Sequence, residues 1–341
     1  MKLHQMTIKD IAKILNISAS TVSRALKNHP DISEETKAAV RRVAESVNYR
    51  PNTLALSLRK AKTNVIGVVV PEMTHHFFSS VLSGMDVTAF NRGYTSIICQ
   101  SSERADREKA SIQSLVDSRV DGILLSVSKS TTDNSFIKKI VDDGMPLVMY
   151  DRVVDGIDVS RVLTDDYAGA YQAVRLMTGH GRKRIALLCG DSGLMVSDNR
   201  RLGYEAALRD SGIDFDENLV IDADTPEKLQ AKMQRLQDIA PVIDGLFAIN
   251  DDTTVLAMKA LRKAGRRIPE DIEVVGFGDD PIAAIIEPSL TSVEQNGYEM
   301  GRAAMNILID QIESGLVVNR SIVKTMSPNI KERESTGAKV N

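Results

Sequence analysis

Residues 7–26 read TIKDIAKILNISASTVSRAL, and this stretch determines how the N-terminal part of the chain folds. Thr7 and Asp10 have the spacing of a capping box, and apolar residues then recur every three or four positions, as on one face of a helix. The run NIS at 16–18 interrupts this pattern, and its serine can cap a second helix over 19–26. Two short helices joined by so tight a turn indicate a helix-turn-helix unit.

The residues that follow predict two more helices. A third helix is expected after the turn residues 28–31, with Ser33 as its N-cap and an apolar stripe that runs to about Val47. The three apolar stripes would share one small core. Pro51 can start a further helix that reaches Lys60. This fourth helix is only about two turns long, so it needs a surface to pack on.

From residue 63 onward, apolar strands alternate with helices. The expected strands are 65–70, 96–99, 122–127, 147–150, 185–189, 242–249 and 272–277. The expected helices lie near 78–92, 106–119, 134–143, 166–179, 199–211, 226–239, 252–264 and 297–313. Such alternation predicts parallel sheets covered by helices on both faces. For so long a segment we expect two similar lobes with a ligand cleft between them.

Charge is distributed unevenly along the 341 residues, whose formal net charge is −3. Residues 1–60 hold 11 Lys and Arg against 5 Asp and Glu, whereas the remainder holds 32 against 41. A basic head on an acidic body is expected to bring only the head to a polyanion such as DNA. A basic surface that merely faces water would carry the same charge, so this observation does not decide the matter alone.

Neither the apolar runs nor the cysteines predict a membrane or secreted protein. No apolar run approaches the roughly 20 residues of a spanning helix, and the N-terminus lacks the apolar region of a secretion signal. Cys99 and Cys189 lie in separate apolar segments and form no CxxC pair, which suits a reducing compartment. We therefore expect a cytoplasmic, nucleoid-associated protein without a membrane partner.

The order of these parts resembles the lactose/galactose repressor (LacI/GalR) family. The motifs that carry the resemblance are TIKDIA at 7–12, ISASTVSRAL at 17–26, NYRPN at 48–52, IGV at 66–68, DGI at 121–123, RRLGY at 200–204, NDD at 250–252, VGF at 275–277 and PSLT at 288–291. The resemblance covers nearly the whole chain. It implies an all-α helix-turn-helix head with a hinge helix, and an α/β body of two parallel-sheet lobes like the periplasmic binding proteins. The domains it implies are a helix-turn-helix DNA-binding domain at 1–50, a hinge helix and linker at 51–62, and an effector-binding and dimerisation domain at 63–341. Within the last domain, lobe 1 is expected at about 63–162 and 293–325, and lobe 2 at about 163–292 and 326–341.

The resemblance implies that the second helix enters the major groove of operator DNA. Arg24 would contact a guanine through both arms of its guanidinium, and Ala19 and Ser20 are small enough for a close approach. The hydroxyls of Thr21 and Ser23 would bind phosphate oxygens. The alternative is that these polar side chains are ordinary solvated helix residues.

The resemblance also implies that the hinge helix binds the minor groove. Leu58 would wedge into a central base step and kink the DNA, with Ala55 beside it and Arg59 near phosphate or in the groove. Asn52 and Thr7 are implied as further DNA contacts. The alternative for Leu58 is an apolar face that packs on the same helix of a second subunit.

For the cleft, the resemblance implies an aromatic wall and polar anchors. Phe77 and Phe78 would form the wall, although core packing at a helix start is the alternative for both. Asp151, Arg200 and Asn250 would bind the ligand's polar groups, as in carbohydrate or nucleoside recognition. Each of the three could instead be a surface or capping residue.

Two further cleft positions are expected, and one departs from the family. Gln295 is a weaker candidate at a crossing between the lobes. Many relatives carry Asp directly after the late Gly-Phe pair, where this chain has Gly278. Either Asp279 replaces that side chain from a shifted position, or the effector lacks the matching hydroxyl.

No catalytic, metal or cofactor site is expected. The strings GDSG at 190–193 and SVSK at 126–129 match short nucleophile motifs, but their wider context is missing. The adjacent His75 and His76 lack the spacing and third ligand that zinc requires. The rival functions are a sugar-binding protein, which would need a secretion signal and no basic head, and a sugar- or nucleoside-modifying enzyme.

The sequence therefore predicts a transcription regulator, expected to be a repressor. Its expected partners are double-stranded operator DNA with a pseudo-palindromic sequence, a second copy of the chain, and a small effector such as a sugar, sugar acid or nucleoside-like molecule. Whether the effector releases the protein from DNA or promotes its binding is open, because both responses would use the same head, hinge and body.

Overall fold

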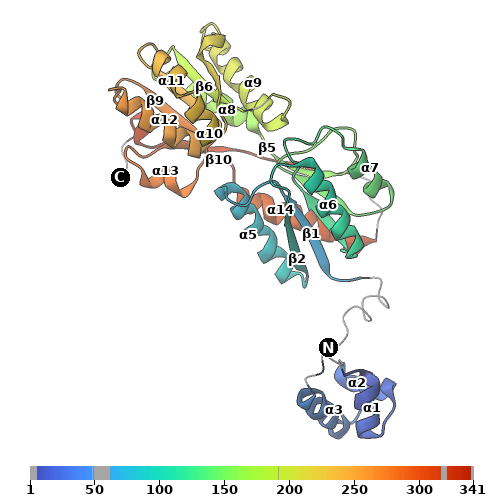
Figure 1. The fold of residues 1–341 in the computed structure, drawn as a ribbon. Coiled ribbons are helices and arrows are strands. Elements are labelled where there is room, and N and C mark those ends of the chain that lie inside the picture. The colour runs from blue at the N-terminus through green and yellow to red at the C-terminus, as the bar shows by residue number, and fades with distance from the viewer. Residues whose placement is uncertain (1–5, 48, 50–61, 191, 316–320, 339–341) are drawn as a thin grey trace. The chain divides into compact units, whose positions relative to one another are not determined.

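The computed structural model describes residues 6–47, 49, 62–190, 192–315 and 321–338. It divides into two compact units, Met1–Thr63 and Asn64–Asn341, which we call the head and the body (Figure 1). The helix expected to start at Pro51 lies outside the described residues.

The head is a bundle of three helices. They are α1 (Ile8–Leu15), α2 (Ala19–Leu26) and α3 (Glu34–Ser46). Their apolar stripes meet in one buried cluster of Ile11, Ala12, Val22, Ala25, Val40 and Ala44. The shared core predicted from the apolar periodicity is therefore confirmed.

Local hydrogen bonds set where the head helices begin. The backbone N–H of Thr7 donates to the Asp10 carboxylate at 2.9 Å, as the capping box predicted. Ser18 Oγ accepts from the backbone N–H of Thr21 at 3.0 Å, and Ser33 caps α3 in the same way. Between α1 and α2, Asn16 takes the left-handed conformation with φ of 50°, which asparagine tolerates better than most residues.

The first lobe of the body is a six-stranded parallel sheet. Its strands, in spatial order, are β11 (Val323–Met326), β5 (Ser160–Thr164), β4 (Leu147–Tyr150), β3 (Gly122–Leu125), β1 (Val65–Val70) and β2 (Thr95–Gln100). One face is covered by α5 (His76–Asn91) and α14 (Gly297–Ser314), and the other by α6 (Ala105–Asp117) and α7 (Ser135–Asp142) (Figure 1).

The second lobe repeats this plan with one antiparallel edge strand. Its strands, in spatial order, are β12 (Asn329–Lys331), β10 (Thr291–Glu294), β9 (Glu273–Gly278), β8 (Gly245–Ala248), β6 (Ile185–Cys189) and β7 (Val220–Asp222). Only β12 runs antiparallel to its neighbour. The covering helices are α8 (Asp166–Gly179) and α9 (Met195–Asp210) on one face, and α10 (Pro226–Ala231), α11 (Met233–Ile239), α12 (Asp251–Lys263) and α13 (Pro281–Ile285) on the other. Two short 3-10 turns lie at Glu217–Leu219 and Glu334–Thr336.

Each sheet is buried on both faces, as the near-continuous apolar strands predicted. Neighbouring strand residues such as Val68 and Val69 point to opposite faces and enter different core clusters, and both are fully buried. The predicted architecture of two parallel-sheet lobes is therefore confirmed.

Helices α5 and α14 pack with their backbones in contact. A Cβ at Gly84 would lie 2.1 Å from the carbonyl oxygen of Tyr298, and a Cβ at Gly301 would lie 2.0 Å from that of Val81. Only glycine fits at either position, because a side-chain carbon would overlap the partner backbone.

The chain passes between the two sheets three times, and each crossing follows a strand. In the first lobe, β5 ends at Thr164 and β11 ends at Met326. In the second lobe, β10 ends at Glu294. These strand ends lie one or two residues beyond the expected boundaries. The ladders continue to the ends, since Thr164 pairs with Met326 and Glu294 pairs with Gly278.

Two predicted elements of the second lobe were wrong in extent. The strand expected at 242–249 is only Gly245–Ala248, because the Asp244 carboxylate accepts from the backbone N–H groups of Lys183 and Arg184 where the ladder begins. The single helix expected near 226–239 is two helices joined at Lys232, whose ψ of 14° leaves the helical range.

Candidate functional site

Two polar side chains stand out on the exposed face of α2 in the head. Ser20 and Arg24 are both exposed, four residues apart. The Arg24 guanidinium makes no hydrogen bond or ion pair with any described residue, so all its donors are available to a partner. Ser20 Oγ lies 2.7 Å from Ser18 Oγ, and Thr21 Oγ1 lies 2.8 Å from the same atom, so three hydroxyls cluster at the start of the helix.

Ala19, which was expected on the outward face of α2, lies at the border between that face and the head core. It is half-buried and packs against the head core, because it is three residues before the fully buried Val22 and therefore shares its side of α2. Thr21 and Ser23 are also half-buried, at the borders of the outward face.

Of the remaining predicted DNA contacts, only Thr7 lies among the residues that the structure describes. Thr7 is exposed at the start of α1 and bonds to Asp10. Asn52, Ala55, Leu58 and Arg59 lie outside the described residues, so their roles stay predictions. The head also exposes further cations on its surface, namely Lys9, Lys13, Lys27, Arg41 and Arg42.

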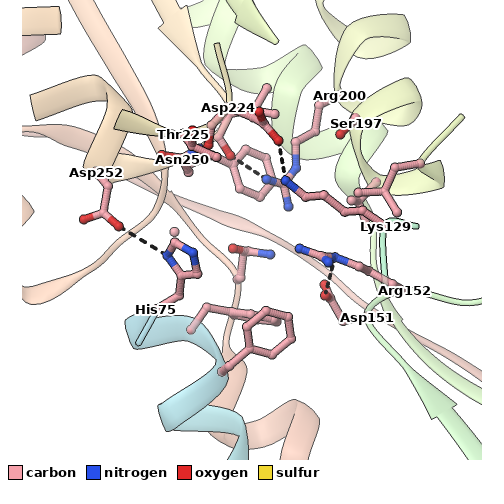
Figure 2. Close-up of a pocket in the computed structure, with 18 of the residues that line it drawn as sticks. His75, Lys129, Asp151, Arg152, Ser197, Arg200, Asp224, Thr225, Asn250 and Asp252 are labelled. Carbon is pink, nitrogen blue, oxygen red and sulfur yellow. Dashed lines mark hydrogen bonds and ion pairs between the residues drawn. The ribbon is translucent and has the colours of Figure 1, made fainter. Parts of the chain in front are cut away.

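A pocket lies between the two lobes of the body (Figure 2). The first lobe contributes His75, Phe77, Phe78, Glu103, Lys129, Asp151 and Arg152 to its lining. The second lobe contributes Leu194, Val196, Ser197, Arg200, Asp224, Thr225, Ile249, Asn250, Asp252, Phe277, Gly278 and Asp280, and Gln295 comes from a crossing between the lobes. Six of the seven predicted effector residues therefore line one pocket.

The first-lobe wall follows the carboxyl ends of parallel strands, where such folds place their ligands. Asp151 and Arg152 come directly after β4, and Glu103 and Lys129 lie in the loops after β2 and β3. Phe77 and Phe78 begin α5 with their rings edge to face, 5.3 Å apart. Phe78 has both of the roles expected for it, because it lines the pocket and is also buried in the lobe core.

Glu103 ties two basic residues of this wall together. Its carboxylate accepts from the backbone N–H of Lys129 at 2.8 Å and from Arg152 Nη1 at 2.7 Å. The Arg152 guanidinium also lies 5.5 Å from the centre of the Phe78 ring. These contacts fix the base of the wall before any ligand arrives.

Asp151 is a buried acid at the floor of the pocket. Burial raises its pKa to about 6, although the nearby Arg152 charge opposes this shift. Its Oδ2 lies 3.8 Å from Arg152 Nε, and its φ of 58° is in the left-handed region. A carboxylate beside a guanidinium offers an acceptor and donors to one ligand, as a sugar diol requires.

Arg200 in α9 is buried and held from three directions. Its Nε and Nη2 donate to Asp166 Oδ1 at 2.8 and 2.7 Å, and its Nη1 donates to the Ile249 carbonyl at 2.5 Å. The guanidinium lies 3.7 Å from the centre of the Phe277 ring, within cation–π range. Burial raises the pKa of Asp166, while the charge of Arg200 opposes that shift. Arg200 therefore also supports the structure of the second lobe.

Asn250 has both a capping and a pocket role. Its Oδ1 accepts from the backbone N–H of Thr253 at the start of α12, and its Nδ2 donates to the Asp224 carbonyl at 2.7 Å. The neighbouring Asp251 is almost fully buried and accepts from Ser292 Oγ at 2.6 Å. Burial raises the pKa of Asp251 to about 7.

The prediction that Asp279 faces the ligand was wrong. Asp279 does not line the pocket, because its Oδ1 lies 2.7 Å from Arg333 Nη2. Gly278 and Asp280, on either side of it, line the pocket instead. Gly278 has φ of 140°, and the left-handed Asp279 then turns its own side chain away.

Three side-chain contacts join the two lobes in or next to the pocket. His75 Nδ1 lies 3.3 Å from Asp252 Oδ2, and a similar pair joins His76 to Asp280. A hydrogen bond to Asp252 raises the pKa of His75. Farther inside, Lys129 Nζ contacts the Asp224 carboxylate (Figure 2).

Several pocket residues were missed from the sequence, most importantly Lys129, Arg152 and Asp224. Arg152 directly follows a predicted strand, so its position at a strand end was a usable signal. Lys129 was considered only within the SVSK string. Its amine contacts Asp224, while Ser126 Oγ is buried with no described hydrogen-bond partner.

The described residues include neither a membrane-spanning helix nor a cluster of metal ligands. None of their helices is long and apolar enough to cross a membrane. No group of three or more potential metal ligands is found among them. Asp191 of the GDSG string lies outside the described residues.

Two family models match the chain. The model for bacterial regulatory proteins of the lacI family matches residues 7–52, and that for a periplasmic binding protein-like domain matches residues 174–336. The ribose operon repressor of Halalkalibacterium halodurans is 32% identical over 308 residues, which are 90% of each chain.

Solved structures show the same arrangement of elements. The transcriptional regulator CelR–cellobiose complex has a TM-score of 0.72 and 29% identity, and the match covers 97% of this chain and 99% of that one. The Lac repressor dimer bound to operator and an anti-inducer has a TM-score of 0.82 with coverage of 98% and 99%. Its identity of 22% shows the fold alone.

Proposed function

The chain belongs to the LacI family of bacterial regulatory proteins, and from this membership we propose that it binds a pseudo-palindromic operator as a dimer and changes its affinity for that operator when a small molecule occupies the pocket. It is a DNA-binding transcription regulator and not an enzyme. The observation that carries the proposal is the exposed and unpartnered Arg24 on the second helix of a helix-turn-helix head.

In the head, Arg24 reads a base edge and Ser20 allows the close approach of α2 to the major groove. Thr21, Ser23 and Thr7 bind phosphates, for which their hydroxyls near helix N-termini are suited. Leu58 opens a central base step from the minor groove, with Asn52, Ala55 and Arg59 beside it. These hinge roles rest on the family motif.

We assign DNA reading to residues 1–50, the hinge to 51–62, and effector binding and dimerisation to 63–341. The match of the lacI family model to 7–52 supports the first boundary, and the division of the structure after Thr63 supports the second. The two lobes are divided after Thr164, Glu294 and Met326, where the chain leaves each sheet.

The effector is a sugar or sugar derivative. The solved CelR complex holds cellobiose, and the ribose operon repressor is named for a sugar operon. The pocket supports this choice because an acceptor, Asp151, lies beside a donor, Arg152, whose guanidinium lies over the Phe78 ring. Asn250, Arg200 and Gln295 line the same space. No role in effector binding is proposed for Asp279.

The two lobes shift relative to one another when the pocket fills, and this shift changes the spacing of the two heads in the dimer. Effector and operator are then coupled by a free energy on the order of 1–3 kcal/mol. A regulator of chromosomal genes acts where the chromosome lies, so we propose a cytoplasmic, nucleoid-associated location.

The dimer uses an apolar surface of the first lobe. Val87 and Phe90 lie three residues apart on α5 with 43% and 79% of their surface exposed, and Ile97 and Ile98 are exposed on the edge strand β2. Helix α5 contacts β2, and Ile98, which pairs with Val68, points to the α5 side of the sheet, whereas Ile97 points to the other side. We therefore assign Val87, Phe90 and Ile98 to one apolar surface. An apolar patch of this kind on a folded domain marks an interaction surface. In the second lobe, Ile285 is 75% exposed.

Replacing Phe90 with glutamate should convert the dimer into monomers at micromolar concentration, because two buried carboxylates would face each other across the two-fold axis. Sedimentation measures the mass. Leu202→Glu is the matched control, since Leu202 is also exposed but lies on α9 of the second lobe. A Phe90→Glu variant that remains dimeric would place the interface elsewhere.

Selection from fragmented DNA of the protein's own genome tests the function as a whole. We expect retention of a few duplexes that share an imperfect inverted repeat, with affinity that falls steeply as salt rises. Adding sugars, sugar acids or nucleosides should change the retention. If no duplex is retained preferentially with or without these compounds, the proposed function is wrong.

A further inference from the structure

Lys129 and Asp224 form a contact between the lobes inside the pocket. Lys129 lies in the loop after β3 of the first lobe, and Asp224 lies just after β7 of the second. The exposed fraction is 24% for the lysine side chain and 5% for the aspartate side chain. The pair is therefore largely shielded from water. In such surroundings opposite charges attract strongly, and an unpaired charge is costly.

The two partners depend on this contact to different degrees. Asp224 also has a partner in its own lobe, because Lys228 Nζ lies 2.9 Å from its Oδ1. Lys129 has no second partner of this kind, since no carboxylate of the described first lobe lies within 4 Å of its amine. Separation of the lobes leaves Asp224 paired with Lys228 and leaves the Lys129 amine without a counter-charge.

The loop backbone that carries Lys129 is also held at a defined place. Its backbone N–H donates to Glu103, and the preceding Ser128 N–H donates to the buried Glu108 at 2.6 Å. Glu103 in turn binds Arg152, which lines the same wall. A cation presented from a fixed loop at the floor of a cleft is a preorganised site for an anion.

The two arginines of the pocket are less suited than Lys129 to bind an anion. Arg200 is neutralised by Asp166 within its own lobe, and all three of its guanidinium nitrogens have partners. Arg152 is paired with Glu103 within the first lobe. Among the lysine and arginine side chains that line the pocket, Lys129 is therefore the one whose pairing depends on closure of the cleft.

We propose, building on the function inferred above, that the effector carries an anionic group, a carboxylate or a phosphate, which binds the Lys129 amine in place of the Asp224 carboxylate. In the ligand-free protein Asp224 acts as a built-in substitute for this anion. When the effector enters, its anion takes Lys129, and Asp224 turns to accept hydrogen bonds from the effector's hydroxyls while keeping Lys228. The effector class is a hydroxylated acid or sugar phosphate and not a neutral sugar.

Matched pairs of ligands test this inference on the full-length protein. Calorimetry and thermal shift compare D-glucose, D-glucuronate and D-glucose 6-phosphate, and the corresponding galactose and ribose series. At least one acid or phosphate should bind at least about tenfold more tightly than its neutral parent, a difference of roughly 1.4 kcal/mol. The carboxylate and phosphate arms identify which anion the site takes.

Two variants connect this preference to the residues. Lys129→Met should abolish the preference of the acid over the neutral parent, because the amine is lost while the apolar stem remains. Asp224→Asn should strengthen acid binding, since the competing carboxylate is gone and the side chain keeps its size. Lys232→Met is the matched control, because Lys232 pairs with Asp222 near the pocket but does not line it, and it should leave the preference unchanged.

The outcomes separate this inference from the proposed function. If a neutral sugar binds as tightly as its acid, if Lys129→Met keeps the preference, or if no acid or phosphate in the panel shows saturable binding, the anionic effector is rejected. A neutral sugar that binds and alters operator retention would reject only this inference and leave the regulator function intact. Loss of operator retention under all conditions would reject the function itself.

Discussion

Replacing Arg24 with alanine should lower the affinity for the operator by about 30-fold to 10⁴-fold and leave effector binding unchanged. A bidentate contact to a base is worth about 1–3 kcal/mol, and the dimer makes two of them. Arg24 is exposed and has no partner among the described residues, so its loss removes no intramolecular contact and should not unfold the head. Fluorescence anisotropy with the operator and with a scrambled duplex measures both affinities.

A second exposed arginine of the head provides the control. Arg42→Ala removes the same charge from α3, and it should weaken binding to both duplexes equally, because a phosphate contact carries no sequence information. If Arg24→Ala also weakens both duplexes equally, Arg24 contacts phosphate and another residue reads the operator. Loss of effector binding in this variant would show that head and body do not act as separate modules.

Replacing Arg200 with alanine should abolish the response to effector and destabilise the body by about 3–5 kcal/mol. The change leaves the buried Asp166 without its counter-charge, and breaking one side of a buried pair costs this much. The head is a separate compact unit, so the protein should still bind operator at low temperature. Chemical denaturation and effector titration of the operator complex measure the two effects.

A double variant separates stability from ligand binding. Arg200→Met with Asp166→Asn removes both charges, so no uncompensated charge remains and much of the lost stability should return. The effector response should stay lost, because the guanidinium over the Phe277 ring is still missing. A normal response in the double variant would mean that Arg200 only supports the fold.

The parts of the structure set by neighbouring residues were predictable from the sequence. The caps at Thr7, Ser18 and Ser33 each bond within three residues, and the apolar stripes of the head fix its core. The long apolar strands of both sheets were predicted because burial on both faces leaves a continuous apolar run. The three-residue strands β7 and β12 carry too little pattern to be recognised.

Contacts between distant parts of the chain could not be predicted in the same way. Lys129 and Asp224 are 95 residues apart, and only the arrangement of the lobes brings them together. Asp279 was misplaced because its orientation depends on Arg333, which returns to the second lobe at the end of the chain. Ala19 was expected on the outward face, but in so short a helix one residue can border both the core and the surface.

The paired glycines of α5 and α14 have a consequence for how a signal leaves the pocket. Helix α5 has about 24 Å of length. Its first residues, including Phe77, touch the ligand space, and its last turn carries Phe90. Because Gly84 and Gly301 lock the two backbones together, α5 cannot bend independently of α14. In the dimer proposed above, with Phe90 at the interface, a small tilt of α5 at the ligand end would be transmitted to the neighbouring subunit.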